Sequence, residues 1–266
     1  MSIAFFDSGI GGITVLNEAL KSCQADKYIY YADTLNGPYG TKSRDEVRKS
    51  VFNAIDFIVT LEVSAIVIAC NTATSVAVED IRKKYSIPII GMEPAVKPAV
   101  KITEGTQKRV LVTATPLTLK EEMLTNLIER IDNEHVVDLL PLPELVQFAE
   151  NFEFKDDVVG DYLTKKLSEC DLNRYGTIVL GCTHFIFYKN LFKKIIPDHI
   201  DVIDGNMGTI NNLKNVLNQI DQHSDGKDNI NKDNIKWYVS GRQVDDIKKL
   251  AEFELLLLLL DSTENI

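Results

Sequence analysis

Short apolar runs alternate along the chain with stretches in which apolar residues recur at helical spacing. The runs are rich in β-branched and aliphatic residues and predict strands at 3–6, 28–31, 65–69, 87–90, 109–112, 136–140, 177–180, 202–203 and 237–239. The helical spacing predicts helices at 14–22, 45–61, 76–85, 119–131, 156–168, 188–195, 208–220 and 243–260. Strands that alternate with helices indicate an α/β fold with mainly parallel sheets covered on both faces.

Two segments of the chain look like copies of one design. Residues 65–72 and 177–184 each run from a β-branched or aliphatic stretch through a small residue to a cysteine and then to polar residues, 112 positions apart. The first strand has a similar counterpart about 105 residues further on, at 110–112. The two offsets predict two similar three-layer α/β lobes. Pro94 and Pro98 are expected to break regular structure at the boundary, which gives lobe one residues 1–95 and 207–266 and lobe two residues 96–206.

Composition narrows the class of protein. The 266 residues are 45% hydrophobic and 26% charged, enough for one large or two medium cores. The net charge of -10 opposes the phosphate backbone of nucleic acids, so nucleic-acid binding is not expected. The N-terminus lacks a basic start, and the longest apolar run, 255–260, is far too short to span a membrane. We interpret that run as a buried helix end or an oligomer contact.

The cysteines indicate a reducing compartment. Four cysteines in a chain of this length are too few for a disulfide framework, so we expect them to be reduced and the protein to be cytoplasmic. Cys23 and Cys170 have no polar neighbours of interest and are expected to be packing residues. The Asp-, Asn- and Lys-rich stretch 222–234 is predicted to be a surface loop.

Candidate chemistry follows the ends of the predicted strands. In open parallel sheets, ligands bind outside the carboxyl ends of the strands. The residues delivered there are Asp7, Ser8, Asp33, Cys70, Asn71, Thr72, Cys182, Thr183 and His184. Cys70 and Cys182 would face each other across a cleft between the lobes. Each precedes a predicted helix start, where the helix dipole is expected to lower the thiol pKa.

Several readings of these residues stay open at this point. The glycine-rich segment 7–12 could hold an anion on backbone N–H groups or be only a tight turn, and it is neither a dinucleotide fingerprint nor a P-loop. Residues 37–40 are typical of a turn. A metal site at Cys70, Cys182 and His184 lacks the usual ligand spacing, and a Cys-His hydrolase would leave one cysteine without a role.

The order and spacing of five motifs resemble the cofactor-independent glutamate racemases of the aspartate/glutamate racemase family. The motifs, which cover the chain from Ile3 to about Ala251, are FDSGIGG at 6–12, Asp33 with PYG at 38–40, ACNTA at 69–73, GMEP at 91–94 and LGCTH at 180–184. The chain departs from many relatives at Asn36, Gln147 and Ile186. The resemblance implies two α/β lobes around an active site, interconversion of L- and D-glutamate without a cofactor or metal, and supply of D-glutamate for peptidoglycan.

The same resemblance implies roles for individual residues. Cys70 and Cys182 match the two acid/base thiols, and Asp7 and His184 match the catalytic polar groups beside them. The substrate-binding pairs correspond to Asp7-Ser8, Tyr39-Gly40, Asn71-Thr72 and Thr183-His184. Glu150 resembles a further active-site acid through a looser match. Dimers are common in the family, so a homodimer is expected.

The predicted chemistry is physically consistent with these residues. Racemisation removes the Cα proton from one face and returns a proton to the other, so two opposed acid/base groups are natural. Without a cofactor to spread the carbanion charge, Asn, Thr and backbone N–H donors in a water-poor cleft must stabilise it. Two rivals remain: a related two-cysteine enzyme that acts on aspartate, a hydantoin or maleate, and a non-catalytic amino-acid-binding protein with two lobes.

Overall fold

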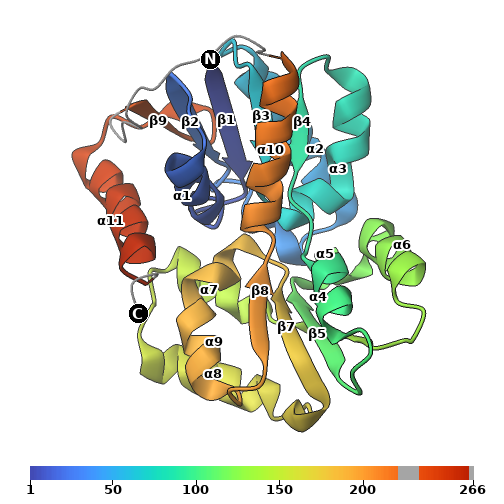
Figure 1. Cartoon of the computed structure of the whole chain (residues 1–266). Helices are drawn as coiled ribbons and strands as arrows, with labels where there is room; N and C mark the ends of the chain where they lie inside the picture. Colours follow the sequence, from blue (N-terminus) through green and yellow to red (C-terminus); the bar gives the residue numbers. More distant parts are fainter. Residues whose placement is uncertain (221–233, 264–266) are drawn as a thin grey trace.

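Two mainly parallel β-sheets form the centre of the protein, one above the other in Figure 1. The computed structural model describes residues 1–220 and 234–263, so the loop predicted at 222–234 lies, except for its last residue, outside the described residues. The first sheet has the strand order β10 (Arg242–Gln243), β9 (Ile235–Val239), β2 (Lys27–Ala32), β1 (Ser2–Asp7), β3 (Ala65–Ile68) and β4 (Ile89–Gly91). The second has the order β6 (Val137–Pro141), β5 (Arg109–Ala114), β7 (Tyr175–Leu180) and β8 (Asp201–Asp204). Only the pairing of β10 with β9 is antiparallel among these strands.

The two sheets repeat one arrangement, which confirms the two similar lobes predicted from the sequence. The order β2-β1-β3-β4 in the first sheet corresponds to β6-β5-β7-β8 in the second. The strands before the two cysteine motifs, β3 and β7, therefore take equivalent places beside the central strands β1 and β5. Because each pair runs parallel, the polar residues that follow the paired strands emerge at the same edge of each sheet.

Helices cover both faces of each sheet, so the inner strands β1, β3, β5 and β7 are almost fully buried and mainly apolar, whereas the edge strands β6, β8 and β10 keep exposed residues. One continuous core contains side chains of α1 (Ile13–Ser22), α10 (Asn206–Ile220) and α11 (Ile247–Thr263) from the first lobe and of α7 (Pro143–Glu150), α8 (Asp156–Leu167) and α9 (Lys189–Ile195) from the second. A second core lies under α2 (Arg44–Val59) and α3 (Asn71–Lys84). A third lies under α4 (Val96–Thr103) and α6 (Glu122–Ile131).

The C-terminal helix α11 is only partly buried by the first sheet. Its Phe253 ring stacks on Trp237 of β9 at a centroid distance of 4.7 Å. In the leucine run, Leu256, Leu257 and Leu260 are buried, whereas Leu255 and Leu258 are 59% and 63% exposed. The run is thus a helix end with one buried and one exposed side. Within residues 1–220 and 234–263, no helix combines the length and apolar character needed to cross a membrane.

Some predicted elements differ from the observed ones. Pro98 does not break regular structure, because it lies in the first turn of α4, where a backbone N–H has no helical partner in any case. Helix α7 was not predicted; it begins at Pro143, a favourable first helical residue. The helix predicted at 119–131 is two helices, α5 (Pro116–Lys120) and α6, because Glu121 between them has an extended backbone, with ψ 137°. The helix predicted at 243–260 begins at Ile247, because Gln243 belongs to β10.

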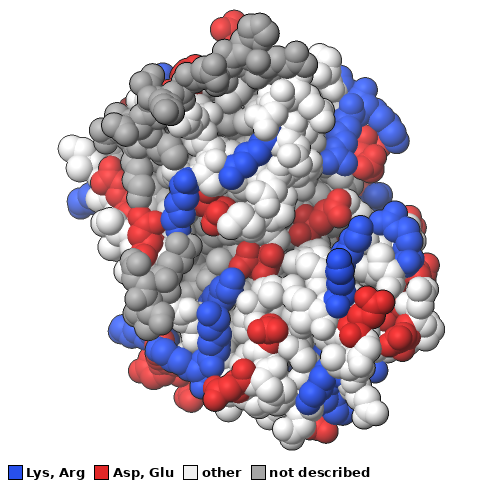
Figure 2. All heavy atoms as spheres, in the orientation of Figure 1, with Lys and Arg blue, Asp and Glu red and all other residues white. Residues whose placement is uncertain are grey.

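The chain passes from one sheet to the other after β4 and returns after β8. The two crossing segments touch, since a Cβ at Gly205 would lie 2.5 Å from the carbonyl oxygen of Glu93. Only glycine permits this close approach of two backbones. On the face drawn in Figure 2, acidic and basic side chains are interspersed over both lobes.

Candidate active site

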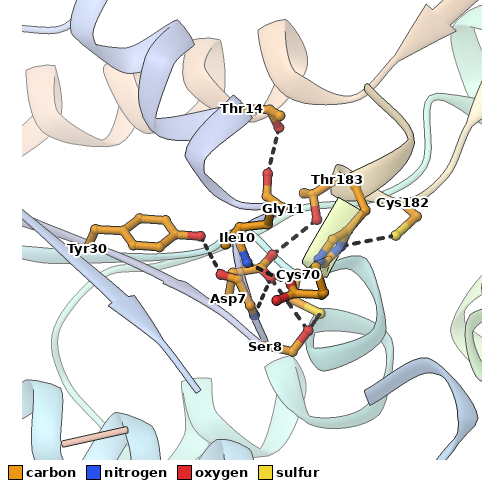
Figure 3. Close-up of polar contacts among 12 residues, drawn as sticks. Asp7, Ser8, Ile10, Gly11, Thr14, Tyr30, Cys70, Cys182 and Thr183 are labelled. Carbon is orange, nitrogen blue, oxygen red and sulfur yellow. Dashed lines mark hydrogen bonds and ion pairs between the residues drawn. The ribbon is translucent and has the colours of Figure 1, made fainter. Parts of the chain in front are cut away.

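Polar residues from both sheets meet between the lobes (Figure 3). Asp7 is the last residue of β1, Cys70 is the N-cap of α3 just after β3, and Cys182 precedes the 3-10 turn Thr183–Tyr188 just after β7. Asp7 is fully buried, and both free cysteines are only 6% exposed. The structure thus places Asp7, Cys70 and Cys182 in the interior at the carboxyl ends of their strands.

A hydrogen bond between the lobes holds Asp7. Its Oδ2 accepts from the Thr183 hydroxyl at 3.1 Å, and its Oδ1 accepts from the Gly9 backbone N–H at 2.9 Å. Thr183 comes from the second lobe and Asp7 from the first, so this contact crosses the interface between them. The glycine-rich segment is therefore a turn whose backbone donates to the carboxylate of its own first residue.

His184 lies between Cys182 and Glu150. Its Nδ1 is 3.7 Å from the Cys182 Sγ, and its Nε2 is 2.6 Å from the Glu150 Oε1. The same carboxylate oxygen accepts from the backbone N–H of Ile10 at 2.9 Å, which ties the end of α7 to the glycine-rich turn. Glu150, matched only loosely from the sequence, lies in the same network as His184.

Cys70 and its neighbour Asn71 have different surroundings. The Cys70 thiol donates to the Ser8 hydroxyl at 3.7 Å and accepts from the Ala73 backbone N–H at 3.4 Å. The Asn71 side chain is 3% exposed, and neither its amide nitrogen nor its amide oxygen has a hydrogen-bond partner in the described part of the chain. A buried, unpartnered amide costs free energy unless a ligand satisfies it.

Three threonine hydroxyls form a triangle across the lobes. Thr72 of the first lobe is 3.0 Å from Thr115 and 2.9 Å from Thr118, and the last two are 3.0 Å apart. Gly40 packs against Thr115, because a Cβ there would lie 2.5 Å from the Thr115 Cβ. Thr115 and Thr118 were not predicted. Thr115 could have been predicted, because it directly follows β5 and so lies at the carboxyl edge of the second sheet, where the other candidates were placed.

Burial reverses one prediction about the thiols. The sequence predicted a lowered thiol pKa at a helix N-terminus, but for Cys70 burial raises the pKa, and the nearby Asp7 carboxylate raises it further. Cys182 precedes a 3-10 turn rather than an α-helix. The prediction was wrong for Cys70 because desolvation of a fully buried thiolate outweighs the helix N-terminus.

The charges of the other site residues are coupled. Burial raises the pKa of Asp7 to about 6 despite the opposing effect of His184. For His184, burial acts to lower the pKa, but the contacts with Cys182 and Glu150 prevail and raise it well above its usual value. For Glu150, burial acts to raise the pKa, but His184 and the Ile10 N–H lower it overall. His184 therefore carries a proton between two acidic neighbours.

The raised pKa of Asp7 gives a testable pH dependence of stability. The folded protein holds the Asp7 proton up to about pH 6, whereas the unfolded chain releases it near 3.8. The free energy of unfolding should therefore fall as pH rises from 4 to 6. Relative to Asp7→Asn, wild type should lose on the order of 3 kcal/mol over that window. Urea denaturation of both proteins at several pH values measures the difference.

Asp138 provides a control of opposite sign. The hydrogen bond from Arg109 holds the pKa of Asp138 below its usual value, against the effect of burial. Compared with Asp138→Asn, wild type should lose stability as pH falls toward the lowered pKa, not as it rises. A flat difference between wild type and Asp7→Asn from pH 4 to 6 would contradict the assignment.

Gly9 and Gly11 of the turn must be glycines, because side chains of the second lobe lie directly against their Cα atoms. A Cβ at Gly9 would lie 1.8 Å from the Glu150 Oε1, and a Cβ at Gly11 would lie 2.4 Å from the Thr183 Oγ1 and 2.5 Å from the His184 Nδ1. The turn thus lets residues of the second lobe reach Asp7.

Among the described residues, no group of three or more His, Cys, Asp and Glu side chains is arranged to hold a metal ion.

Solved structures that resemble this chain include glutamate racemases. The glutamate racemase of Campylobacter jejuni superposes with a TM-score of 0.79 at 27% identity, covering 98% of this chain and 99% of that one. The Escherichia coli glutamate racemase, solved with L-glutamate and the activator UDP-MurNAc-ala, gives 0.78 at 27% identity over 97% and 93% of the two chains. The two-lobe fold therefore places the chain in the class of amino-acid racemases.

Sequence similarity defines the family. Residues 11–211 match the Asp/Glu/Hydantoin racemase family. A glutamate racemase of Halothermothrix orenii is 55% identical over 219 residues, which are 82% of this chain and 86% of that protein. Glutamate racemase 2 of Bacillus subtilis is 50% identical over 264 residues, 99% and 98% of the two chains. The chain belongs to the Asp/Glu/Hydantoin racemase family.

Proposed function

We propose that the protein interconverts L- and D-glutamate by proton transfer at Cα between two thiols, without a cofactor. The observation that carries the proposal is the burial of Cys70 and Cys182, one from each lobe, beside the same glycine-rich turn. The Cys70–Ser8–Asp7 contacts end at the Gly9 N–H, and the Cys182–His184–Glu150 contacts end at the neighbouring Ile10 N–H. The high identity to glutamate racemases supports glutamate as the substrate.

The different surroundings of the thiols suit one base and one acid. Burial and Asp7 raise the pKa of Cys70 and keep its proton in place, which suits Cys70 as the acid, and Cys182, 3.7 Å from His184, is assigned as the base. A thiolate at Cys182 accepts the Cα proton from one face of the substrate, and the Cys70 thiol gives its proton to the opposite face. After this step Cys182 is the thiol and Cys70 is the thiolate. The reaction in the opposite direction begins from that state, with Cys70 as the base.

Asp7 and Glu150 act through their neighbours in this scheme. Asp7 sets the protonation of Cys70 electrostatically, and Glu150 holds the His184 ring by its Nε2 and keeps the imidazole charged. The two thiols thus have separate neighbours, Asp7 with Ser8 beside Cys70 and Glu150 with His184 beside Cys182.

The substrate needs donors for its carboxylates and for the charge that develops at Cα. The Asn71 amide has no partner and is the first candidate, with Ser8, Thr72 and Thr183 close by. The pair Tyr39-Gly40 closes the site beside Thr115. We therefore assign substrate binding to Asp7, Ser8, Tyr39, Gly40, Asn71, Thr72, Thr183 and His184, and we add Thr115 and Thr118 on the basis of the hydroxyl triangle.

The lobes frame this site. We place lobe one at residues 1–95 and 207–266 and lobe two at 96–206, boundaries that fall beside the two chain crossings after β4 and β8. The site residues are almost fully buried, so glutamate would enter when the lobes separate and react when they close. Closure excludes water and strengthens the electrostatic interactions on which the carbanion depends.

The wider role follows from the reaction. D-Glutamate is a component of bacterial peptidoglycan, and we propose that the protein supplies it from the cytoplasm, in keeping with its four free cysteines. We also propose a homodimer. The exposed Leu255 and Leu258 of α11 offer an apolar contact, and light scattering after gel filtration would test the oligomeric state.

The function is tested by circular dichroism of L-glutamate, D-glutamate and both aspartate enantiomers incubated with protein freed of pyridoxal phosphate and metal. We expect both glutamate signals to decay to zero while the aspartate signals persist, and in D2O the Cα position should gain deuterium. Decay of the aspartate signals alone would identify another substrate. Binding of glutamate without decay or deuterium entry would favour a binding protein and contradict the proposal.

A further inference from the structure

The carboxylate of Asp33 lies in the interior just after β2, 2% exposed. It accepts four hydrogen bonds. The Tyr39 hydroxyl donates to Oδ2 at 2.5 Å, the Asn36 amide donates to both oxygens at 3.0 and 3.1 Å, and the Ser240 hydroxyl donates to Oδ1 at 3.3 Å. A buried carboxylate is retained only when such donors satisfy it. None of the roles assigned above uses Asp33.

The bond to Asp33 decides what Tyr39 can offer a ligand. A phenol hydroxyl has one hydrogen to donate, and the Tyr39 hydroxyl donates it to Asp33. Burial and the Asp33 carboxylate raise the pKa of Tyr39, so the hydroxyl keeps this proton. The ring itself is buried beside Phe6, with a centroid distance of 6.4 Å. The pair Tyr39-Gly40 can therefore contact a substrate through its main chain, while the Tyr39 side chain serves as an anchor.

The loop that Asp33 anchors is packed directly against the site. The Asp33 N–H donates to the Asp7 carbonyl at 2.9 Å. A Cβ at Gly37 would lie 2.3 Å from the Ser8 carbonyl oxygen, and one at Gly40 would lie 2.5 Å from Thr115 of the other lobe. The loop thus fills the space between Ser8 and Thr115, and a shift of Tyr39 would move Gly40 relative to both.

A late segment of the chain holds Asp33 from the opposite side. Ser240 follows β9, its N–H donates to the Ala32 carbonyl at 2.8 Å, and its hydroxyl accepts from the Leu35 N–H at 3.0 Å. The same hydroxyl donates to Asp33. Asp33 is therefore fixed between the loop it anchors and the end of β9.

We propose that Asp33 is a positioning residue for substrate binding, which acts through the Tyr39 hydroxyl to fix the main chain of Tyr39-Gly40 in the site. The inference rests on the proposed racemisation of glutamate. Asp33 does not touch the reacting atoms, so its loss should weaken binding of substrate and transition state alike and change KM rather than kcat.

The test is a double-mutant cycle in steady-state kinetics. Tyr39→Phe and Asp33→Ala should each raise KM for glutamate about 10-fold, with kcat within about threefold of wild type, because each removes a hydrogen bond to a charged group. The double variant should show no greater rise than the single ones, since both remove the same bond. Asp33→Asn keeps an acceptor for the Tyr39 hydroxyl and should restore most of the wild-type KM.

Tyr28→Phe is the matched control. Tyr28 is in β2, the strand that ends just before Asp33. It is 1% exposed and donates to the Cys23 carbonyl at 2.5 Å, away from the site. This variant should lose thermal stability with an unchanged KM. An unchanged KM in Tyr39→Phe, an equal rise in Tyr28→Phe, or rises that multiply in the double variant would each overturn the inference. If Asp33→Ala does not fold, Tyr39→Phe and Asp33→Asn decide the matter alone.

Different outcomes would overturn the role of Asp33 and the proposed racemisation. Wild type that racemises glutamate with a KM unaffected by Tyr39→Phe overturns the role of Asp33 and leaves the proposed function intact. Wild type that does not racemise glutamate overturns the proposed function and, with it, the role assigned to Asp33 in binding glutamate.

Discussion

Cys70→Ser and Cys182→Ser proteins should each lose glutamate racemisation by roughly 1000-fold or more, because a serine hydroxyl is far too weak an acid to replace a thiol in proton transfer. Exchange of the Cα proton with solvent should be lost for one glutamate enantiomer and kept for the other. Each variant keeps one thiol, so it should exchange the Cα proton of one enantiomer for deuterium without inverting it. Circular dichroism measures racemisation, and proton NMR in D2O measures exchange for each enantiomer.

Cys170→Ser is the matched control. Cys170 is a free, partly buried cysteine that lies outside the site network, so its variant should racemise glutamate at the wild-type rate. Full activity of Cys70→Ser or Cys182→Ser would refute the scheme with two bases. Loss of exchange from both enantiomers in one variant, with normal exchange in the other, would indicate a single base.

Gly11→Ala should reduce kcat by about 100-fold, the cost expected when catalytic groups are displaced by about 1 Å. The new Cβ would lie 2.4 Å from the Thr183 Oγ1 and 2.5 Å from the His184 Nδ1, so both side chains must move. Thr183 would then leave Asp7, and His184 would leave Cys182. Steady-state kinetics with glutamate, together with far-UV circular dichroism to confirm the fold, measures the effect.

Gly208→Ala tests whether the effect is specific to the turn. Gly208 is in α10, and a Cβ there would meet nothing within 4 Å. Alanine should raise helix stability by about 0.5 to 1 kcal/mol without changing kcat. A Gly11→Ala protein with a wild-type kcat would mean that the contact between the glycine-rich turn and His184 has no bearing on turnover.

Much of this architecture could be predicted from local pattern. The apolar runs located β1 to β9 to within a few residues, and the repeated cysteine motifs predicted the equivalence of β3 and β7. The carboxyl-end rule then placed Asp7, Cys70 and His184 at the same edge before any contact was known. These inferences succeed because they depend on the chain's own periodicity and on the geometry of parallel strands.

Other features depend on packing between segments far apart in sequence. Glu150 meets His184 and Ile10 only because α7 packs against the glycine-rich turn, and periodicity did not predict α7. The shift in the Cys70 pKa depends on how deeply the thiol is buried, which a helix start does not reveal. Thr118 joins the site through its hydroxyl contacts with Thr115 and with Thr72 of the other lobe.

The two crossings between the sheets also set an order for assembly during synthesis. The second sheet is made of one continuous stretch, residues 109–204, and can complete its pairing when β8 leaves the ribosome. The first sheet cannot, because β9 pairs with β2 and begins only at Ile235. Until then β2 is an open edge, able to pair with other chains. We therefore expect the smaller sheet to finish first and the chain to be most prone to aggregate while β9 is still being made.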